Sequence, residues 1–149
     1  MQIASEWNPM KSDDKVLSAD TILTIPFHDV DSAQVVWHGH YAKYLEIARA
    51  RLLDKIDYNY AQMTASGYFW PVIEMNLRYI APLRFQQEIH VTATLKEWEN
   101  RLRVEYLITD AATGKRLTTA STTQVAVSMS TGEMLLASPS VLAAKMRGS

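Results

Sequence analysis

Side chains capable of acid, base or nucleophilic chemistry gather in one short stretch of the sequence, residues 27–41, called here the reactive loop. It holds two carboxylates and three histidines: Asp29, Asp31, His28, His38 and His40. A helix is predicted to start at its end, so unpaired backbone N–H groups and the positive end of a helix dipole point outward there. Such N–H groups stabilise an oxyanion, and a nearby carboxylate activates water or attacks a carbonyl. Hydrolysis of an acyl thioester uses such parts.

The reactive loop also has a purely structural interpretation. Asp31 and Ser32 are favoured turn residues, and His38 or Gly39 could simply begin the helix. A metal site is disfavoured, because histidines two residues apart on a turning backbone do not specify a ligand geometry. We therefore predict no metal and no cofactor. From the residues alone, the loop is either catalytic or a turn.

Hydrophobic periodicity predicts the elements that position this loop. A short strand runs from Thr21 into the loop, and apolar residues at three- and four-residue steps then predict an amphipathic helix over residues 39–56. Its predicted solvent side carries Lys43, Arg49, Lys55 and Asp57. Strands with period-two alternation follow at residues 73–79, 89–95, 102–108 and 117–127, with a weaker one at 133–136. Hairpin-length links join the middle three strands into an antiparallel meander.

These elements predict an α+β fold, an antiparallel sheet of about five strands packed on one long helix. One helix cannot cover so wide a sheet, so the remaining apolar face and an open edge strand call for a second copy, as a homodimer or homotetramer. Residues 1–19 are predicted as a flexible arm, residues 20–137 as the domain and residues 138–149 as a C-terminal tail.

Composition excludes several classes of protein. The chain of 149 residues is 48% hydrophobic and 21% charged, as in ordinary globular domains. It has 15 basic and 16 acidic residues and no basic block, which argues against nucleic acid as a partner. It has no cysteine, which excludes disulfides, thiolate metal sites and a cysteine nucleophile. No segment approaches the roughly 18 apolar residues of a membrane span, so we expect no membrane partner and a cytoplasmic location.

A family resemblance adds to this interpretation of the loop. The residues that carry it are Asp31-x-x-x-Val35-Val36-Trp37-His38-x-x-Tyr41-x-x-Tyr44-Leu45-Glu46-x-Ala48-Arg49 and the later Tyr79-x-x-Pro82. With these residues the chain resembles, over about residues 20–128, the hotdog-fold thioesterases of the hydroxybenzoyl-CoA type and their short-chain acyl-CoA relatives.

The resemblance implies a hotdog fold, in which the sheet wraps a central helix, protomers pair, and each active site lies at the protomer interface. It implies an acyl-CoA or acyl-carrier-protein thioester as substrate. Asp31 would be the catalytic carboxylate, as nucleophile or general base. His38 would begin the helix, with its backbone N–H aimed at the thioester carbonyl.

Further candidate substrate-binding residues lie in and after the loop. Gln34 stands where the family often has glycine, so we expect an altered loop, a narrower pocket or an amide hydrogen bond to the thioester. Gly39 and Tyr41, at the start of the helix, are also candidate substrate-binding residues. Glu46, two turns inside the helix, either meets a polar group of the substrate or forms a salt bridge with Arg49 or Arg51.

Two candidates lie outside the loop and helix. Trp70, with Tyr68 and Phe69, either lines an acyl pocket or belongs to the core. Arg78, like Arg84 and Arg101, either holds CoA phosphates or lies on a solvated face.

Two other functional classes stay open beside a thioester hydrolase. A hotdog dehydratase or hydratase needs a histidine and an acid across an alkene-forming carbon, and its usual His-x-x-x-Pro or Asp-x-Asn-x-x-His loop is not legible here. A non-catalytic module that binds acyl groups or carrier proteins would keep the pocket without needing Asp31. The sequence favours hydrolysis.

Overall fold

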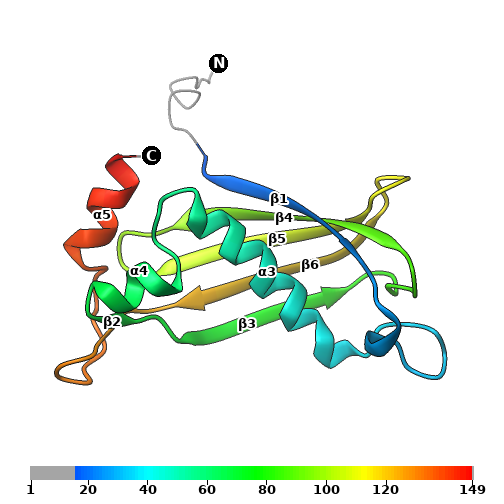
Figure 1. Cartoon of the computed structure of the whole chain (residues 1–149), viewed down its shortest axis with the longest axis horizontal. Coiled ribbons are helices and arrows are strands. Elements are labelled where there is room, and N and C mark those ends of the chain that lie inside the picture. Colours follow the sequence, from blue (N-terminus) through cyan, green and yellow to red (C-terminus); the bar gives the residue numbers. More distant parts are fainter. Residues whose placement is uncertain (1–15, 149) are drawn as a thin grey trace, which may run out of the picture.

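A five-stranded antiparallel sheet forms the body of the protein, seen in a computed structural model that describes residues 16–148. The strand order is β1-β4-β5-β6-β3, and helix α3 lies across one face of the sheet (Figure 1). The predicted meander of three consecutive strands is confirmed by the β4–β5 and β5–β6 pairings. The strands are β1 (Ser18–Thr24), β3 (Val72–Tyr79), β4 (Glu88–Glu97), β5 (Leu102–Asp110) and β6 (Arg116–Gln124).

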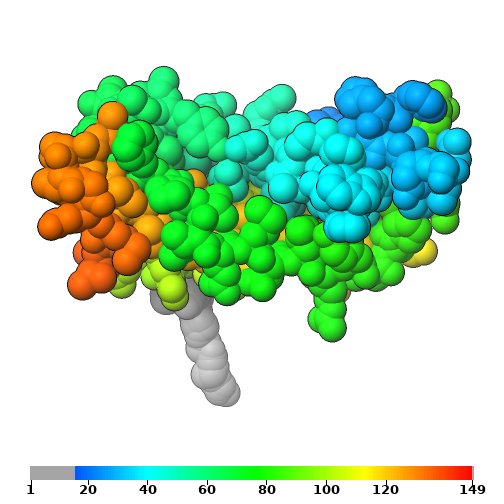
Figure 2. All heavy atoms as spheres, turned by 90° about the horizontal axis from the view of Figure 1, so that it is seen from below, coloured from blue at the N-terminus to red at the C-terminus, as the bar shows by residue number. Residues whose placement is uncertain are grey.

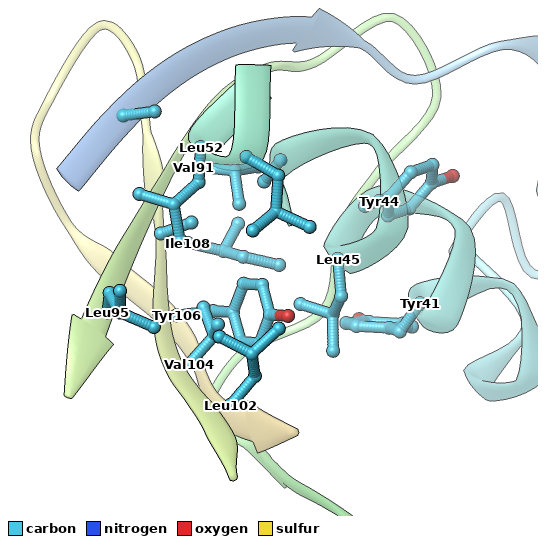
Figure 3. Close-up of a cluster of buried hydrophobic side chains, with 14 of the residues drawn as sticks. Tyr41, Tyr44, Leu45, Leu52, Val91, Leu95, Leu102, Val104, Tyr106 and Ile108 are labelled. Atoms are coloured by element: carbon cyan, nitrogen blue, oxygen red, sulfur yellow. The ribbon is translucent and has the colours of Figure 1, made fainter. Parts of the chain in front are cut away.

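The predicted helix over residues 39–56 is observed as a short 3₁₀ turn, η2 (His38–His40), followed by α3 (Tyr41–Asp54). Its apolar stripe packs on β1 and β4 because residues three and four apart share one face. Figure 3 shows this core, with α3 side chains facing those of β4 and β5; the labelled residues are Tyr41, Tyr44, Leu45, Leu52, Val91, Leu95, Leu102, Val104, Tyr106 and Ile108.

Arg49 corrects the predicted solvent side of this helix, because its side chain is buried. Its guanidinium donates to the Tyr106 hydroxyl (3.3 Å) and to the Tyr60 hydroxyl (3.2 Å). A buried cation needs such partners. The helical pattern alone could not reveal them, since both tyrosines lie on other elements.

The helix covers only part of the sheet. Strands β4 and β5 bury their inward side chains, whereas β3 at the edge is exposed along nearly its whole length. Viewed from below in Figure 2, α3 and the green β3 stand on two sides of a groove, with yellow-orange atoms of β6 visible between them. Strand β3 is thus both an open edge of the sheet and the strand whose side chains the helix leaves uncovered.

Several smaller elements complete the described fold. A 3₁₀ turn, η1 (Phe27–Asp29), lies at the start of the reactive loop, and α4 (Tyr60–Ala65) follows α3. A two-stranded sheet pairs β2 (Tyr68–Phe69) with β7 (Val127–Ser128). The weak strand predicted at residues 133–136 is not formed, because Met134 makes a single bridge to the short β7 and the chain then turns away.

The segment predicted as a C-terminal tail contains helix α5 (Ser140–Arg147). Leu142 is fully buried, and Ser138 binds the carbonyls of Trp98 (2.5 Å) and Glu99 (2.9 Å). The segment thus packs on the domain. Most of the predicted arm, residues 1–19, falls outside the described residues, although Ser18 and Ala19 belong to β1. Within residues 16–148 no helix is long and apolar enough to cross a membrane.

Candidate active site

The first half of the reactive loop forms a tight hairpin with Asp31 near its tip. The Trp37 amide donates to the Asp29 carbonyl (3.1 Å), and the Asp31 amide donates to the Val35 carbonyl (2.9 Å). One oxygen of the exposed Asp31 carboxylate accepts the Ala33 amide (2.8 Å), as is usual for an aspartate that begins a turn. This bond occupies one lone pair only, so the carboxylate keeps capacity to accept a proton or to attack.

Gln34 closes this turn in the left-handed region of backbone space, with φ of 69°. Its amide donates to the Asp31 carbonyl (2.9 Å), and its own carbonyl accepts the Phe85 amide (3.3 Å). Glutamine thus adopts here a backbone conformation that glycine favours.

Asp29, two residues before Asp31, is buried and fixed to the first turn of α3. One carboxylate oxygen binds Lys43 Nζ at 2.6 Å, and the other accepts the Tyr44 hydroxyl at 2.6 Å. Burial alone would raise the pKa of Asp29, but the hydrogen bonds from Lys43 and Tyr44 outweigh it and hold the pKa below its ordinary value. Burial and the carboxylate raise the pKa of Tyr44. Asp29 therefore anchors the loop as an anion.

Four backbone amides lie at the start of the helix, and two of them are free to donate to a ligand. The Tyr41 amide binds the His38 carbonyl, and the His40 amide binds the Trp37 carbonyl (2.9 Å). Among the described residues, the amides of His38 and Gly39 donate to no backbone carbonyl. They are the orphan N–H groups expected at a helix N-terminus, where the helix dipole also favours negative charge.

Gly39 allows the Trp37 indole to lie against the helix start. A Cβ atom on Gly39 would come within 2.2–2.7 Å of three ring atoms of Trp37, so any other residue displaces the ring. The indole also contacts the rings of His38 and His40, with centroids 5.1 and 5.3 Å away. Glycine at position 39 is therefore needed for the packing of the Trp37 ring, which the sequence alone did not reveal.

A hollow of about 240 Å³, the active-site hollow, opens beside the helix start. Its walls come from the loop, α3 and the end of β3: Val36, His38, Tyr41, Tyr79, Ile80, Ala81 and Pro82. Tyr41 is buried and forms part of the wall, and burial raises its pKa. The Tyr79 hydroxyl donates to the His38 carbonyl (3.2 Å), a contact that its place in the sequence motif did not predict. Asp31 lies outside the walls of this hollow.

The remaining candidates lie away from the loop. The Glu46 carboxylate accepts the Tyr60 hydroxyl (3.2 Å) and lies 3.8 Å from Arg49, which is the salt bridge that the helical spacing predicted. Trp70 is buried and donates to the Tyr58 hydroxyl (3.2 Å), as a core residue does. It precedes β3 at the end of the sheet far from the loop (Figure 1).

Arg78 lies on the face of the sheet opposite α3. There it borders a broad hollow of about 640 Å³ that includes three further cations, Lys96, Arg103 and Arg116. The structure therefore places Asp31 and Gln34 at the tip of the reactive loop and His38, Gly39 and Tyr41 at the start of the helix, with only His38 and Tyr41 in the walls of the active-site hollow; Glu46, Trp70 and Arg78 lie outside these two places. Within residues 16–148 no group of three or more acidic or histidine side chains is arranged to hold a metal ion.

Comparison with known proteins decides the family. A family model described as the thioesterase-like superfamily matches residues 25–145. The chain belongs to this superfamily. The protein is 31% identical over 116 residues, 77% of its length, to "Putative esterase sll0410" of Synechocystis, and the match covers 70% of that relative. A shorter match to "Putative acyl-CoA thioesterase YneP" of Bacillus subtilis has 25% identity over 76 residues and spans about half of each chain, 51% and 52%.

Solved structures confirm the hotdog fold of this thioesterase-like protein. The DHNA-CoA thioesterase of Staphylococcus aureus superposes with a TM-score of 0.73 over 80% of each chain, at 24% identity. The sheet and helix of this chain are those of the hotdog architecture. The family and its relatives support an acyl thioester hydrolase, as the resemblance implied.

Proposed function

We propose that the protein hydrolyses acyl-CoA or acyl-carrier-protein thioesters with Asp31 as the catalytic carboxylate and the His38 and Gly39 amides as oxyanion donors. One observation supports this most: of the two unpaired helix-terminal amides, that of His38 belongs to a residue that lines a hollow, and the turn that bears an exposed Asp31 is tied to the same helix through Asp29. A cytoplasmic location is part of the proposal and rests on the sequence alone.

The chemistry follows from these groups. The thioester carbonyl oxygen accepts hydrogen bonds from the His38 and Gly39 amides, which strengthen as the oxygen becomes negative. Asp31 then acts in one of two ways. As a nucleophile it attacks the carbonyl carbon and expels the thiolate, and water later cleaves the resulting anhydride. As a general base it removes a proton from water, whose oxygen attacks the carbon and expels the thiolate.

An isotope experiment separates the two routes. In a single turnover in ¹⁸O-water, a nucleophilic Asp31 delivers its own ¹⁶O to the acid product and itself takes up ¹⁸O when water attacks the anhydride at the aspartyl carbonyl carbon. General-base catalysis puts ¹⁸O into the product at the first turnover, as does water attack at the acyl carbon of an anhydride, so ¹⁶O in the product with ¹⁸O in Asp31 is the result that identifies a nucleophile. Both results fit the proposed site, and neither is available to a non-catalytic module.

The substrate class is tested by a panel of acyl-CoA and acyl-carrier-protein thioesters of graded length and aromaticity. Release of free thiol by the wild type, abolished by Asp31→Asn, is the expected result. A hotdog hydratase would instead consume an enoyl thioester without releasing thiol. Binding without turnover across the whole panel would overturn the proposal in favour of an acyl-binding module.

We also propose that two copies pair along β3, as a homodimer or as a pair of dimers. The strand is an unpaired edge with exposed apolar side chains at Val72, Ile73, Met75 and Tyr79, a surface that soluble proteins rarely leave open. A second copy seated there would add its surface beside the active-site hollow and enclose the exposed Asp31. Light scattering should give at least twice the chain mass of 16.9 kDa. An active monomer at micromolar concentration would refute the pairing.

A further inference from the structure

A second hollow directly adjoins the active-site hollow. It measures about 280 Å³ and shares two wall residues, Ala81 and Pro82, with the hollow beside His38. Beyond these two residues its walls are mostly polar: Arg84, Gln87, Asp110, Thr113, Lys115 and Leu117. Ala81 and Pro82 thus lie between the hollow beside His38 and a polar, cationic chamber.

Two exposed cations of this chamber have no carboxylate partner. Neither Arg84 nor Lys115 forms an ion pair in the part of the chain that the structure describes. The only acid in the walls is Asp110, which already accepts hydrogen bonds from Gln87 Nε2 (2.8 Å), the Thr113 amide (2.8 Å) and the Thr113 hydroxyl (2.9 Å). The chamber thus keeps a net positive charge, with its one anion bound to its own loop.

Rigid backbone holds both cations in place. Arg84 forms a β-bridge with Val35 of the reactive loop, and the neighbouring Val36 amide donates to the Leu83 carbonyl (2.8 Å). Lys115 ends the β5–β6 turn, where its carbonyl accepts the Asp110 amide (2.9 Å). The backbone at Arg84 is therefore bonded directly to the loop that carries Asp31, and the backbone at Lys115 is bonded to Asp110 in the wall of the same chamber.

The chemistry of the substrate fits this arrangement. CoA carries its thiol at one end of a pantetheine arm and its phosphates at the other, so a thioester at His38 sends the phosphates outward. We propose that Arg84 and Lys115 form a subsite for the phosphates of CoA, reached over Ala81 and Pro82. This inference rests on the proposed function. Arginine and lysine are the side chains that bind phosphate oxygens best.

The proposal is tested with two substrates that share acyl group and pantetheine arm, acyl-CoA and acyl-pantetheine, which lacks the phosphates. We expect the wild type to have a KM for acyl-CoA at least roughly tenfold lower, with similar kcat, because uniform binding at a remote site lowers KM alone. Arg84→Gln and Lys115→Gln should each raise the KM for acyl-CoA severalfold. In the double variant, the KM for acyl-CoA should rise to the value that the wild type has for acyl-pantetheine. The KM for acyl-pantetheine itself should stay unchanged.

A matched control is Arg116→Gln, next to Lys115 in sequence but on the broad hollow of the opposite sheet face. It removes one positive charge from the same strand end and should leave both KM values as in the wild type. An equal effect of Arg116→Gln would show general charge attraction and overturn the subsite. An unchanged KM for acyl-CoA in the double variant, or an equal rise for both substrates, would overturn it too.

Binding measurements keep the inference separate from the proposed function. If the wild type hydrolyses neither substrate, the proposed function fails, and calorimetry with free CoA tests the chamber alone. A Kd at least roughly tenfold weaker in the double variant would support the subsite, and an equal Kd would refute it. If the double variant lost activity on an acyl-carrier protein but kept its KM for acyl-CoA, the cations would serve the carrier and the CoA assignment would be wrong.

Discussion

The base and the tip of the reactive loop hold carboxylates two residues apart in opposite surroundings. Asp29 at the base is 2% exposed and both its oxygens are bonded by side chains of α3. Asp31 near the tip is exposed and accepts one amide from its own turn. A carboxylate whose lone pairs are bound and whose charge is paired is a poor base or nucleophile. The comparison assigns anchoring to Asp29 and leaves chemistry to Asp31.

The strongest test of this division is Asp31→Asn. Asparagine keeps the size and the turn-forming oxygen but can neither attack as a carboxylate nor accept a proton from water at neutral pH. We expect single-turnover hydrolysis of a good acyl-CoA to fall by at least roughly a hundredfold, while the melting temperature stays close to that of the wild type. Near wild-type turnover would reduce Asp31 to a turn residue.

Asp29→Asn should mainly lower the free energy of unfolding and should affect turnover less. The change removes the charge that Lys43 and Tyr44 bind, and such charge-assisted bonds contribute about 2 kcal/mol when partly buried. We expect urea unfolding to lose about that free energy, with a smaller fall in turnover than for Asp31→Asn. Tyr44→Phe, which removes one of the two bonds, is the matched control and should lose less. A larger activity loss in Asp29→Asn than in Asp31→Asn would reverse the assignment.

The pH dependence of stability sharpens the same contrast. The pKa of Asp29 is lowered from its ordinary value of 3.8, so the native state holds the proton more weakly than the unfolded chain. The stability that the anion contributes is therefore present above pH 3.8 and is lost as the pH falls through the lower native value. The difference in unfolding free energy between wild type and Asp29→Asn should shrink below pH 3.8. A difference that stayed constant would mean that the charge of Asp29 is not what stabilises the loop.

His38→Ala should have a weaker effect on turnover than Asp31→Ala. The proposed oxyanion donor is a backbone amide, which survives removal of the imidazole. We expect a loss of severalfold, measured as kcat under saturating acyl-CoA, against at least roughly a hundredfold for the aspartate. If the histidine variant were the more damaged of the two while remaining folded, the imidazole would be the principal acid or base.

Periodicity in the sequence sufficed for the main elements, because the strands of the meander and α3 each bury one regular stripe. It failed where one long-range contact decides. The guanidinium of buried Arg49 binds hydroxyls from β5 and α4, and α5 packs on the core through Leu142 with Val141 and Met146 beside it; neither contact leaves a regular stripe in the sequence.

For the candidate site, the residue types and their clustering identified the reactive loop but could not distinguish its two carboxylates. The distinction depends on Lys43 and Tyr44, 14 and 15 residues from Asp29, which reach it only after the helix forms. Of the two cations of the chamber, the sequence named Arg84 as a possible phosphate ligand but gave no reason to join it to Lys115, which only the fold brings beside it.

The smallest expected effect comes from Gln34, which shapes the tip of the reactive loop but bonds to neither the Asp29 nor the Asp31 carboxylate. Its φ of 69° costs a residue with a Cβ about 1 kcal/mol, a strain that glycine lacks. Glycine also gains freedom in the unfolded chain, which offsets roughly half to all of that relief. We therefore expect Gln34→Gly to change the free energy of unfolding by less than about 1 kcal/mol and to leave turnover nearly unchanged. Gln34→Val is the matched opposite, because a β-branched side chain is an outlier in this conformation and should destabilise by more than about 1 kcal/mol. Urea unfolding and kcat for both variants separate geometry from chemistry: if Gln34→Gly cut kcat severalfold at unchanged stability, the side-chain amide would be binding the thioester and the tip would hold a second chemical group beside Asp31.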